Sequence, residues 1–305
     1  MLRRLRRWID PWLPRPWRRG VFIPDSLWRR TVSGLPFLQT LNLREQNRLY
    51  RLCAHFLQEK EFTGAHELTV SDEMALSIAA QACFPLLHMC LPDGQAPKYA
   101  AQMLEWYDDF VGIVVQPGAA LAKREVRDSL GVVHQYDEAL AGEAMHRGPV
   151  MVTWSEVARA AELAHRGRNV VIHEFAHKLD MRGMSYGTSA DGAPPLHARA
   201  LGHDTLEAAQ AEWRDTMKAQ FDAFTDAVAR AERFGEPAPW LDAYGSTSPA
   251  EFFAVTVEAF FTAREQFGFD FPVLLDLYDR FFRPLKFFGP HSQVPLQAPA
   301  EPSAR

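Results

Sequence analysis

Residues 173–177 read His-Glu-Phe-Ala-His, and no other segment constrains this chain as strongly. The surrounding run from Asn169 to Asp180 passes from apolar to polar residues and predicts a helix. On a helix, residues i and i+4 lie one turn apart on the same face. Two imidazoles placed in this way can bind one metal ion, with Glu174 beside them as a general base.

A chance match has to be weighed against this interpretation. An amphipathic helix can place two histidines on one face without binding anything. However, Val170, Val171 and Ile172 predict that the helix packs into a core, where a charged glutamate is costly unless it is paired. The H-E-x-x-H pattern is typical of zinc peptidases, so it predicts one Zn²⁺ per chain and hydrolysis of peptide bonds.

A zinc site of this kind needs a third protein ligand. The metzincin extension would require glycine at position 180 and histidine at 183, but the chain has Asp180 and Gly183. Asp180 lies one turn beyond His177 and could bind the metal, although such a carboxylate more often orients a histidine. More distant residues could also supply the ligand, namely His197, His203, Glu251 and Glu258.

Composition bounds the class of protein. The 305 residues carry a net charge of −5, which gives no support for direct nucleic-acid binding. The three cysteines, Cys53, Cys83 and Cys90, form no C-x-x-C pair and favour buried thiols in a reducing, cytoplasmic setting. No apolar run is long enough for a transmembrane segment.

The two ends differ from the rest of the chain. Residues 1–20 are rich in Arg and Trp and lack the apolar core of a signal peptide. They predict a solvated basic tail, with weak contact to an anionic membrane or acidic partner as the alternative. We expect one peptidase domain over 21–290, with a helical part at about 21–110 and a catalytic part at about 111–290. Residues 291–305 are rich in Pro and Ala and predict a flexible tail.

Periodicity predicts a mostly helical chain with a few short strands. Helices are expected over 42–60, from 71 or 72 to 86, over 155–164 and over 206–234, where an aromatic stripe faces the core. Strands are expected at 111–115 and 148–154, with 132–134 as a third candidate. The Gly- and Pro-rich residues 180–205 predict a long loop.

A second group of candidates lies at 242–254. Ser248 and Pro249 predict a helix start, and Glu251 follows three residues after the cap. Glu251 could therefore complete a capping box or serve as the third zinc ligand, and the local pattern does not separate the two. Glu258 lies two turns further on the same face and is the reserve ligand. Tyr244 could donate to a developing oxyanion, although a half-buried loop tyrosine is the simpler interpretation.

Several of these segments together resemble one known family. Together, the segments 169–180, 242–253, 131–134 and 148–154 resemble the Mlc titration factor A family. Its members are zinc-dependent peptidases of the gluzincin type, with a catalytic site related to that of lethal-factor toxins. The resemblance covers roughly residues 21–290.

The resemblance implies a role for each matching residue. His173 and His177 would bind zinc, Glu174 would be the general base, and Glu251 would be the third ligand. Tyr244 would stabilise the transition state. The family also links the histidine of its Gly-x-Val-His segment, here His134, to the metal. A fourth protein ligand would occupy the position that water needs and would have to leave it.

The resemblance also implies a fold and a function. We expect an α+β fold, mostly helical and zincin-like, with a small β-sheet beside the active-site helix. The expected activity is a zinc metallopeptidase acting on peptide substrates, aminopeptidase-like in specificity. The alternative is a regulatory protein that binds and titrates a glucose-responsive transcriptional repressor, with peptidase activity secondary.

Overall fold

A computed structural model describes residues 20–89, 97–118, 120–127, 133–140, 142–144, 148–183, 191–197 and 200–283. Within these ranges the chain is mostly helical, with one four-stranded sheet and a separate two-stranded sheet. The expected α+β class is confirmed. No helix in this part of the chain is both long and apolar enough to cross a membrane.

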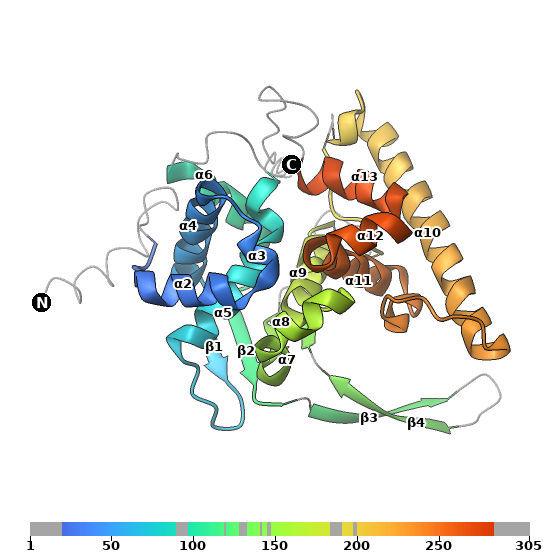
Figure 1. The fold of residues 1–305 in the computed structure, drawn as a ribbon, viewed down its shortest axis with the longest axis horizontal. Helices are drawn as coiled ribbons and strands as arrows, with labels where there is room; N and C mark the ends of the chain where they lie inside the picture. The colour runs from blue at the N-terminus through green and yellow to red at the C-terminus, as the bar shows by residue number, and fades with distance from the viewer. Residues whose placement is uncertain are drawn as a thin grey trace, which may run out of the picture.

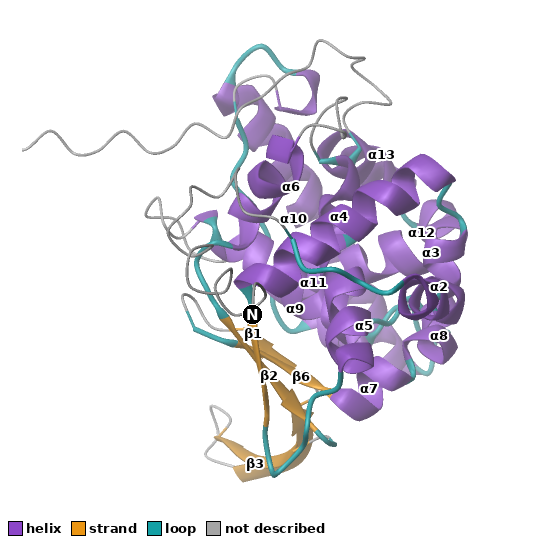
Figure 2. Ribbon diagram, turned by 90° about the vertical axis from the view of Figure 1, so that its left-hand side faces the viewer, coloured by secondary structure: helices purple, strands orange, loops and turns teal. Residues whose placement is uncertain are grey.

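The larger sheet has the strand order β1-β2-β6-β5. Its first three strands, β1 (Glu61–Gly64), β2 (Gly112–Gln116) and β6 (Val150–Thr153), are parallel, and β5 (Gly142–Ala144) pairs antiparallel at the edge. Alternate apolar residues on β2 and β6 are fully buried, as period-two strands packed on helices require. The sheet lies to one side of the helices (Figure 2). The strands predicted at 111–115 and 148–154 are confirmed as β2 and β6.

The third strand candidate belongs to a different sheet. Val133 and His134 begin β4 (Val133–Leu140), which pairs antiparallel with β3 (Ala120–Arg127). This hairpin extends away from the helices (Figure 1). Short β-branched runs do not say which sheet they join, because pairing partners are chosen by tertiary contacts.

The N-terminal helices lie before and after β1 in the chain. Asn42 begins the longest of them with a capping box that includes Glu45, and Ser71 caps another through the amide of Met74. The helices predicted over 42–60 and 71–86 are confirmed, the second ending in a 3₁₀ turn. The elements are α2 (Asp25–Gly34), α3 (Pro36–Gln39), α4 (Leu43–Glu59), α5 (Asp72–Cys83), η3 (Pro85–His88), α6 (Pro97–Leu104) and η4 (Glu105–Tyr107).

The central helix is α9 (Val170–Met181), which contains the pentapeptide. The segment before it was predicted as one helix over 155–164, and this is wrong in detail. The backbone leaves the helical region at Arg159 (φ −95°, ψ 6°) and splits the segment. The pieces are α7 (Trp154–Ala158), α8 (Ala160–Leu163) and η5 (Ala164–Arg166).

Helices of the C-terminal half lie on the other side of α9 from α2–α6 (Figure 1). The predicted aromatic stripe on the long helix is confirmed as core, with Trp213, Met217, Phe224 and Val228 buried. The elements are η7 (Ala200–Gly202), α10 (Leu206–Phe234), η8 (Ala243–Ser246), α11 (Pro249–Thr262), α12 (Arg264–Asp270) and α13 (Pro272–Phe282).

Packing holds α9 on several sides. It contacts β5 and β6 on one side and α11 on another. The Phe175 ring lies 4.9 Å from the Tyr107 ring and 5.7 Å from the Phe56 ring, centroid to centroid. Every residue of α11 from Phe252 to Phe261 is buried. Dense packing of this kind leaves α9 and α11 little freedom to shift relative to each other.

Candidate metal centre

The start of α9 places the two motif histidines on one face. Asn169 caps the helix, and its Oδ1 accepts a hydrogen bond from the Ile172 amide at 2.9 Å. The Nε2 atoms of His173 and His177 lie 3.2 Å apart. Val171 and Ile172 are fully buried and anchor the opposite face. The helix and the shared face predicted from the pentapeptide are therefore both present.

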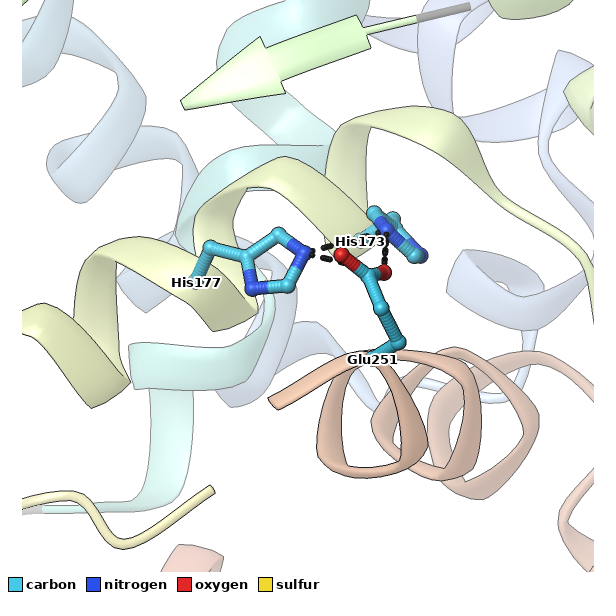
Figure 3. A group of neighbouring side chains, drawn as sticks. All are labelled: His173, His177 and Glu251. Atoms are coloured by element: carbon cyan, nitrogen blue, oxygen red, sulfur yellow. Dashed lines mark hydrogen bonds and ion pairs between the residues drawn. The ribbon is translucent and has the colours of Figure 1, made fainter. Parts of the chain in front are cut away.

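Glu251 reaches the same point from α11. Its Oε2 lies 3.1 Å from His173 Nε2 and 3.3 Å from His177 Nε2. Figure 3 shows the three side chains pointing toward one another from the two helices. Among the described residues they form a group whose ligand atoms all lie within 4.8 Å of one another.

The spacing of these atoms fits a small tetrahedral ion. Bonds of about 2.0–2.2 Å to such an ion would separate neighbouring ligand atoms by about 3.3–3.6 Å. The observed separations of 3.1, 3.2 and 3.3 Å agree within a few tenths of an ångström. Moreover, Glu251 Oε2 is buried without a well-directed hydrogen bond within the described part of the chain. The three atoms therefore converge on a common point.

The cap at Ser248 coexists with this arrangement. Ser248 Oγ accepts a hydrogen bond from the Glu251 amide at 3.2 Å, and Pro249 occupies the first turn. The Glu251 carboxylate faces the histidines and does not reach back to the cap. The Ser248 cap is therefore present, but the capping box considered for the Glu251 side chain is wrong, because that carboxylate faces the histidines.

Glu258 lies on the far side of the His173 ring. Its Oε1 is 2.7 Å from His173 Nδ1, and its Oε2 accepts a hydrogen bond from the Asn169 amide. In the neutral ring a carboxylate at Nδ1 favours the proton on that nitrogen, so that the Nε2 lone pair is available on the side of Glu251 and His177. The signal in the sequence was the spacing of Glu258 from Glu251, two turns apart on one helix face.

Asp180 is tied to the loop that follows α9. Its carboxylate accepts hydrogen bonds from the amides of Gly192 at 2.9 Å and Ala193 at 3.0 Å. Burial raises the pKa of Asp180 to about 6, against the lowering effect of these bonds. The predicted role was to orient a histidine. The carboxylate that contacts a histidine ring in this way is Glu258, whereas the hydrogen bonds of Asp180 hold the loop.

Tyr244 and Glu174 flank the histidines. Tyr244 lies on η8, 42% exposed, with its ring centroid 6.4 Å from that of His173. The side chain of Asp242 accepts a hydrogen bond from the Tyr244 amide at 3.1 Å and pairs with Arg168, next to the α9 cap. Glu174 is 3% exposed. The Tyr244 ring thus lies beside the His173 ring, and the charge of Glu174 contributes to raising the pKa of His173.

The other histidine candidates have different surroundings. His203 Nε2 lies 2.7 Å from Glu212, which also pairs with Arg280. His203 and His197 are not members of the group formed by His173, His177 and Glu251. The backbone of His134 lies on β4 opposite Val126, and its side chain falls outside the described residues.

Charge in the group favours a cation. Burial lowers the pKa of His173, but the carboxylates of Glu258 and Glu251 more than offset this and raise it well above its ordinary value. Burial raises the pKa of Glu251, but pairing with both histidines outweighs this and brings it to about 2. The His173 imidazole among these carboxylates thus holds positive charge readily, and a metal cation would compete with protons for this position.

Comparisons with known proteins identify the family to which the chain belongs. Residues 12–283 match the family described as glucose-regulated metallo-peptidase M90. Mlc titration factor A of Salmonella arizonae is 31% identical over 270 residues, which cover 88% of this chain and 95% of the relative. Mlc titration factor A of Enterobacter sp. (strain 638) is 29% identical over 270 residues, covering 88% and 90%. The chain belongs to the Mlc titration factor A family, the glucose-regulated metallo-peptidases M90.

Proposed function

We propose that this chain is a zinc-dependent peptidase that binds one Zn²⁺ through His173, His177 and Glu251. The single observation that supports this most strongly is the convergence of two Nε2 atoms and one carboxylate oxygen within 3.1–3.3 Å of one another. Two imidazoles and a carboxylate are a donor set that catalytic zinc uses, with one position left for water or substrate. Zn²⁺ is accordingly the ion we assign.

The remaining residues would perform the proton transfers. When bound, zinc polarises the scissile carbonyl and lowers the pKa of water toward neutrality. Glu174 is placed on α9 between the two histidines, where it would accept a proton from the attacking water and return it to the leaving amine. The Tyr244 hydroxyl would donate a hydrogen bond to the oxyanion that develops on the carbonyl. His173 is held for this by Glu258 at Nδ1.

Metal analysis combined with a Glu174→Gln variant tests this proposal. The wild type should bind one zinc per chain and cleave peptides. The variant should keep the metal but lose about 10²–10⁴-fold in kcat, because only the proton acceptor is removed. The exposed Glu265 offers a matched control, and Glu265→Gln should change neither quantity. Near wild-type hydrolysis by Glu174→Gln would contradict the assigned mechanism.

We further propose that the activity is that of an aminopeptidase, a specificity implied by the family resemblance. Aminoacyl reporter substrates with free and acetylated N-termini separate this from endopeptidase action. A free amine should be required for cleavage. Equal rates on both substrates would favour an endopeptidase.

His134 enters the proposal through the family resemblance alone. As a fourth ligand it would occupy the position that water needs. His134→Ala should then weaken zinc binding while raising kcat at saturating zinc. Unchanged zinc affinity would remove His134 from the ligand set.

The names of the relatives support a second candidate function. They are called Mlc titration factor A, and this chain would correspondingly bind a glucose-responsive transcriptional repressor in the cytoplasm. Pull-down of a purified repressor homologue tests this. If binding is independent of catalysis, Glu174→Gln should retain it fully, whereas cleavage of the repressor by wild type alone would make it a substrate.

A further inference from the structure

A row of buried polar side chains connects α5 to the candidate ligand His173. Gln81 on α5 and Asn169 at the start of α9 are 0% and 1% exposed, and Gln81 Oε1 lies 2.8 Å from Asn169 Nδ2. The backbone N–H of Asn169 donates a hydrogen bond to Glu258 Oε2, and Glu258 Oε1 lies 2.7 Å from His173 Nδ1. Four residues on three helices and one cap thus form one continuous hydrogen-bonded path.

The hydrogen bonds determine how each amide in this path is oriented. Gln81 Nε2 donates to the carbonyl of Ser77 at 3.0 Å and to its hydroxyl at 3.2 Å. Gln81 Oε1 therefore faces Asn169 and accepts from Nδ2. This leaves Asn169 Oδ1 to accept from the Ile172 amide and cap α9. The network assigns the amide orientations, since oxygen and nitrogen are interchangeable in shape.

The apolar surroundings of Gln81 would make its side-chain amide destabilising without these hydrogen bonds. Apart from Ser77, the α5 residues around it are apolar, and Ile78, Ala79, Ala80 and Ala82 are fully buried. A polar amide in such a helix is destabilising unless every hydrogen bond is satisfied. An apolar residue would pack there without this requirement, so the amide has a specific use.

We propose that Gln81 is a positioning residue for the metal site, an inference that rests on the proposed zinc function. By fixing the side-chain amide of Asn169, Gln81 holds the backbone N–H of Asn169 against one oxygen of Glu258. The other oxygen then keeps the His173 ring turned with Nε2 toward Glu251 and His177. The alternative is that Gln81 only satisfies the Asn169 side chain and stabilises the fold.

Zinc affinity measured by competition with a chromophoric chelator separates these alternatives. Gln81→Met removes the hydrogen bonds and keeps the side-chain length, and Asn169→Ser keeps a capping oxygen but loses the donor to Gln81. Each variant should weaken zinc binding by about tenfold, the low end of the range for partners that orient metal ligands. The double variant should be no weaker than either single variant, because both break one path.

The cobalt absorption spectrum gives a second measurement that stability alone does not change. Both single variants should alter the d–d bands of the Co²⁺ protein in the same way. Ile78→Val on the same helix is the matched control: it loses core packing, lowers the melting temperature, and should leave zinc affinity and the cobalt spectrum unchanged.

The outcomes are distinct. Zinc affinity of Gln81→Met and Asn169→Ser within twofold of wild type, with unchanged cobalt spectra, would overturn the positioning role and leave the zinc proposal intact. Additive losses in the double variant would also overturn it. A wild-type protein that binds no zinc would overturn the proposed function and this inference together. If Gln81→Met does not fold, the zinc affinity and cobalt spectrum of Asn169→Ser test the positioning role in its place.

Discussion

Ser248 caps α11, and its hydroxyl accepts a hydrogen bond at 3.2 Å from the backbone N–H of Glu251 in the first turn. This bond sets where α11 begins. It leaves the Glu251 carboxylate free of the cap and within 3.1 Å of His173. A helix start of this kind positions a metal ligand on rigid backbone, which a loop does less well.

Substitutions at these two positions should therefore have different effects. Ser248→Ala should lower the free energy of unfolding by about 1 kcal/mol, the usual cost of a lost cap. It should change zinc affinity only slightly. Loss of a residue that orients a metal ligand weakens metal binding by about 10–100-fold. Glu251→Gln removes a proposed ligand itself and should weaken zinc binding by more than this. Denaturant unfolding and chelator competition measure the two quantities.

Thr205→Ala is the matched control for the cap. Thr205 accepts a hydrogen bond from the Ala208 amide at 3.2 Å at the start of α10, so its removal should cost similar stability with no effect on zinc. If Ser248→Ala abolished zinc binding while Thr205→Ala did not, the cap would have a larger part in placing Glu251 than we infer.

Tyr244→Phe should reduce kcat by about 10²–10³-fold and leave KM and zinc content nearly unchanged. Removing one oxyanion donor typically has this effect, because the hydrogen bond forms only in the transition state. The ring should keep its place 6.4 Å from His173, since the backbone amide stays bonded to Asp242. Steady-state kinetics with a peptide reporter measures both constants. A loss confined to KM would assign Tyr244 to substrate binding.

Gly192→Ala should destabilise the protein more than Gly235→Ala does. Both glycines have left-handed backbone, with φ +78° and +67°, so both variants should lose roughly 1–2 kcal/mol from this cause. A Cβ at Gly192 would also lie 2.7 Å from the Pro249 carbonyl oxygen at the start of α11, whereas at Gly235 it would meet open space. The difference in melting temperature between the two variants measures the cost of the steric clash at Gly192. Equal losses would mean that the loop moves away at little cost.

Stability should depend on pH through Glu212. Hydrogen bonds from Arg280 lower its pKa, with partial burial acting in the opposite direction. Because the folded-state pKa lies below the unfolded one, this stabilisation is present above the unfolded pKa and is lost as pH falls through the folded value. Glu212→Gln should lower the melting temperature by about 1–2 °C near pH 7, equivalent to at most about 1 kcal/mol for this partly exposed pair.

The gap in melting temperature between wild type and Glu212→Gln should then narrow below the ordinary glutamate pKa of about 4.3. Glu232→Gln, an exposed position on the same helix, controls for the general effect of removing one negative charge. A gap that stayed constant from pH 7 to pH 3.5 would show that the pair with Arg280 contributes no pH-dependent stability.

Much of the site was predictable from local sequence. The i, i+4 spacing of His173 and His177 placed them on one helix face before any tertiary information was used. The cap at Ser248 and the strands β2 and β6 were equally local, because each depends on backbone preferences within a few residues. The splitting of the segment at Arg159 was not predicted from that pattern.

Contacts between distant residues were decided only by the tertiary structure. From the local pattern, Glu251 could be either part of a helix cap or a metal ligand, and Glu258 was only a reserve ligand. Packing of α11 against α9 placed the Glu251 carboxylate beside Nε2 and the Glu258 carboxylate beside Nδ1 of the same ring. The link from Gln81 had no signature in the sequence at all.

The pentapeptide by itself determined a helix with two histidines and a glutamate arranged for metal chemistry. Its local geometry follows from hydrogen bonds within one turn, which sequence spacing specifies. The identity of the third converging side chain, the tautomer of His173 and the anchoring of Asp180 to Gly192 depend on how separate helices and loops pack. That packing is set by apolar surfaces distributed over the whole chain, so no single segment contains the information.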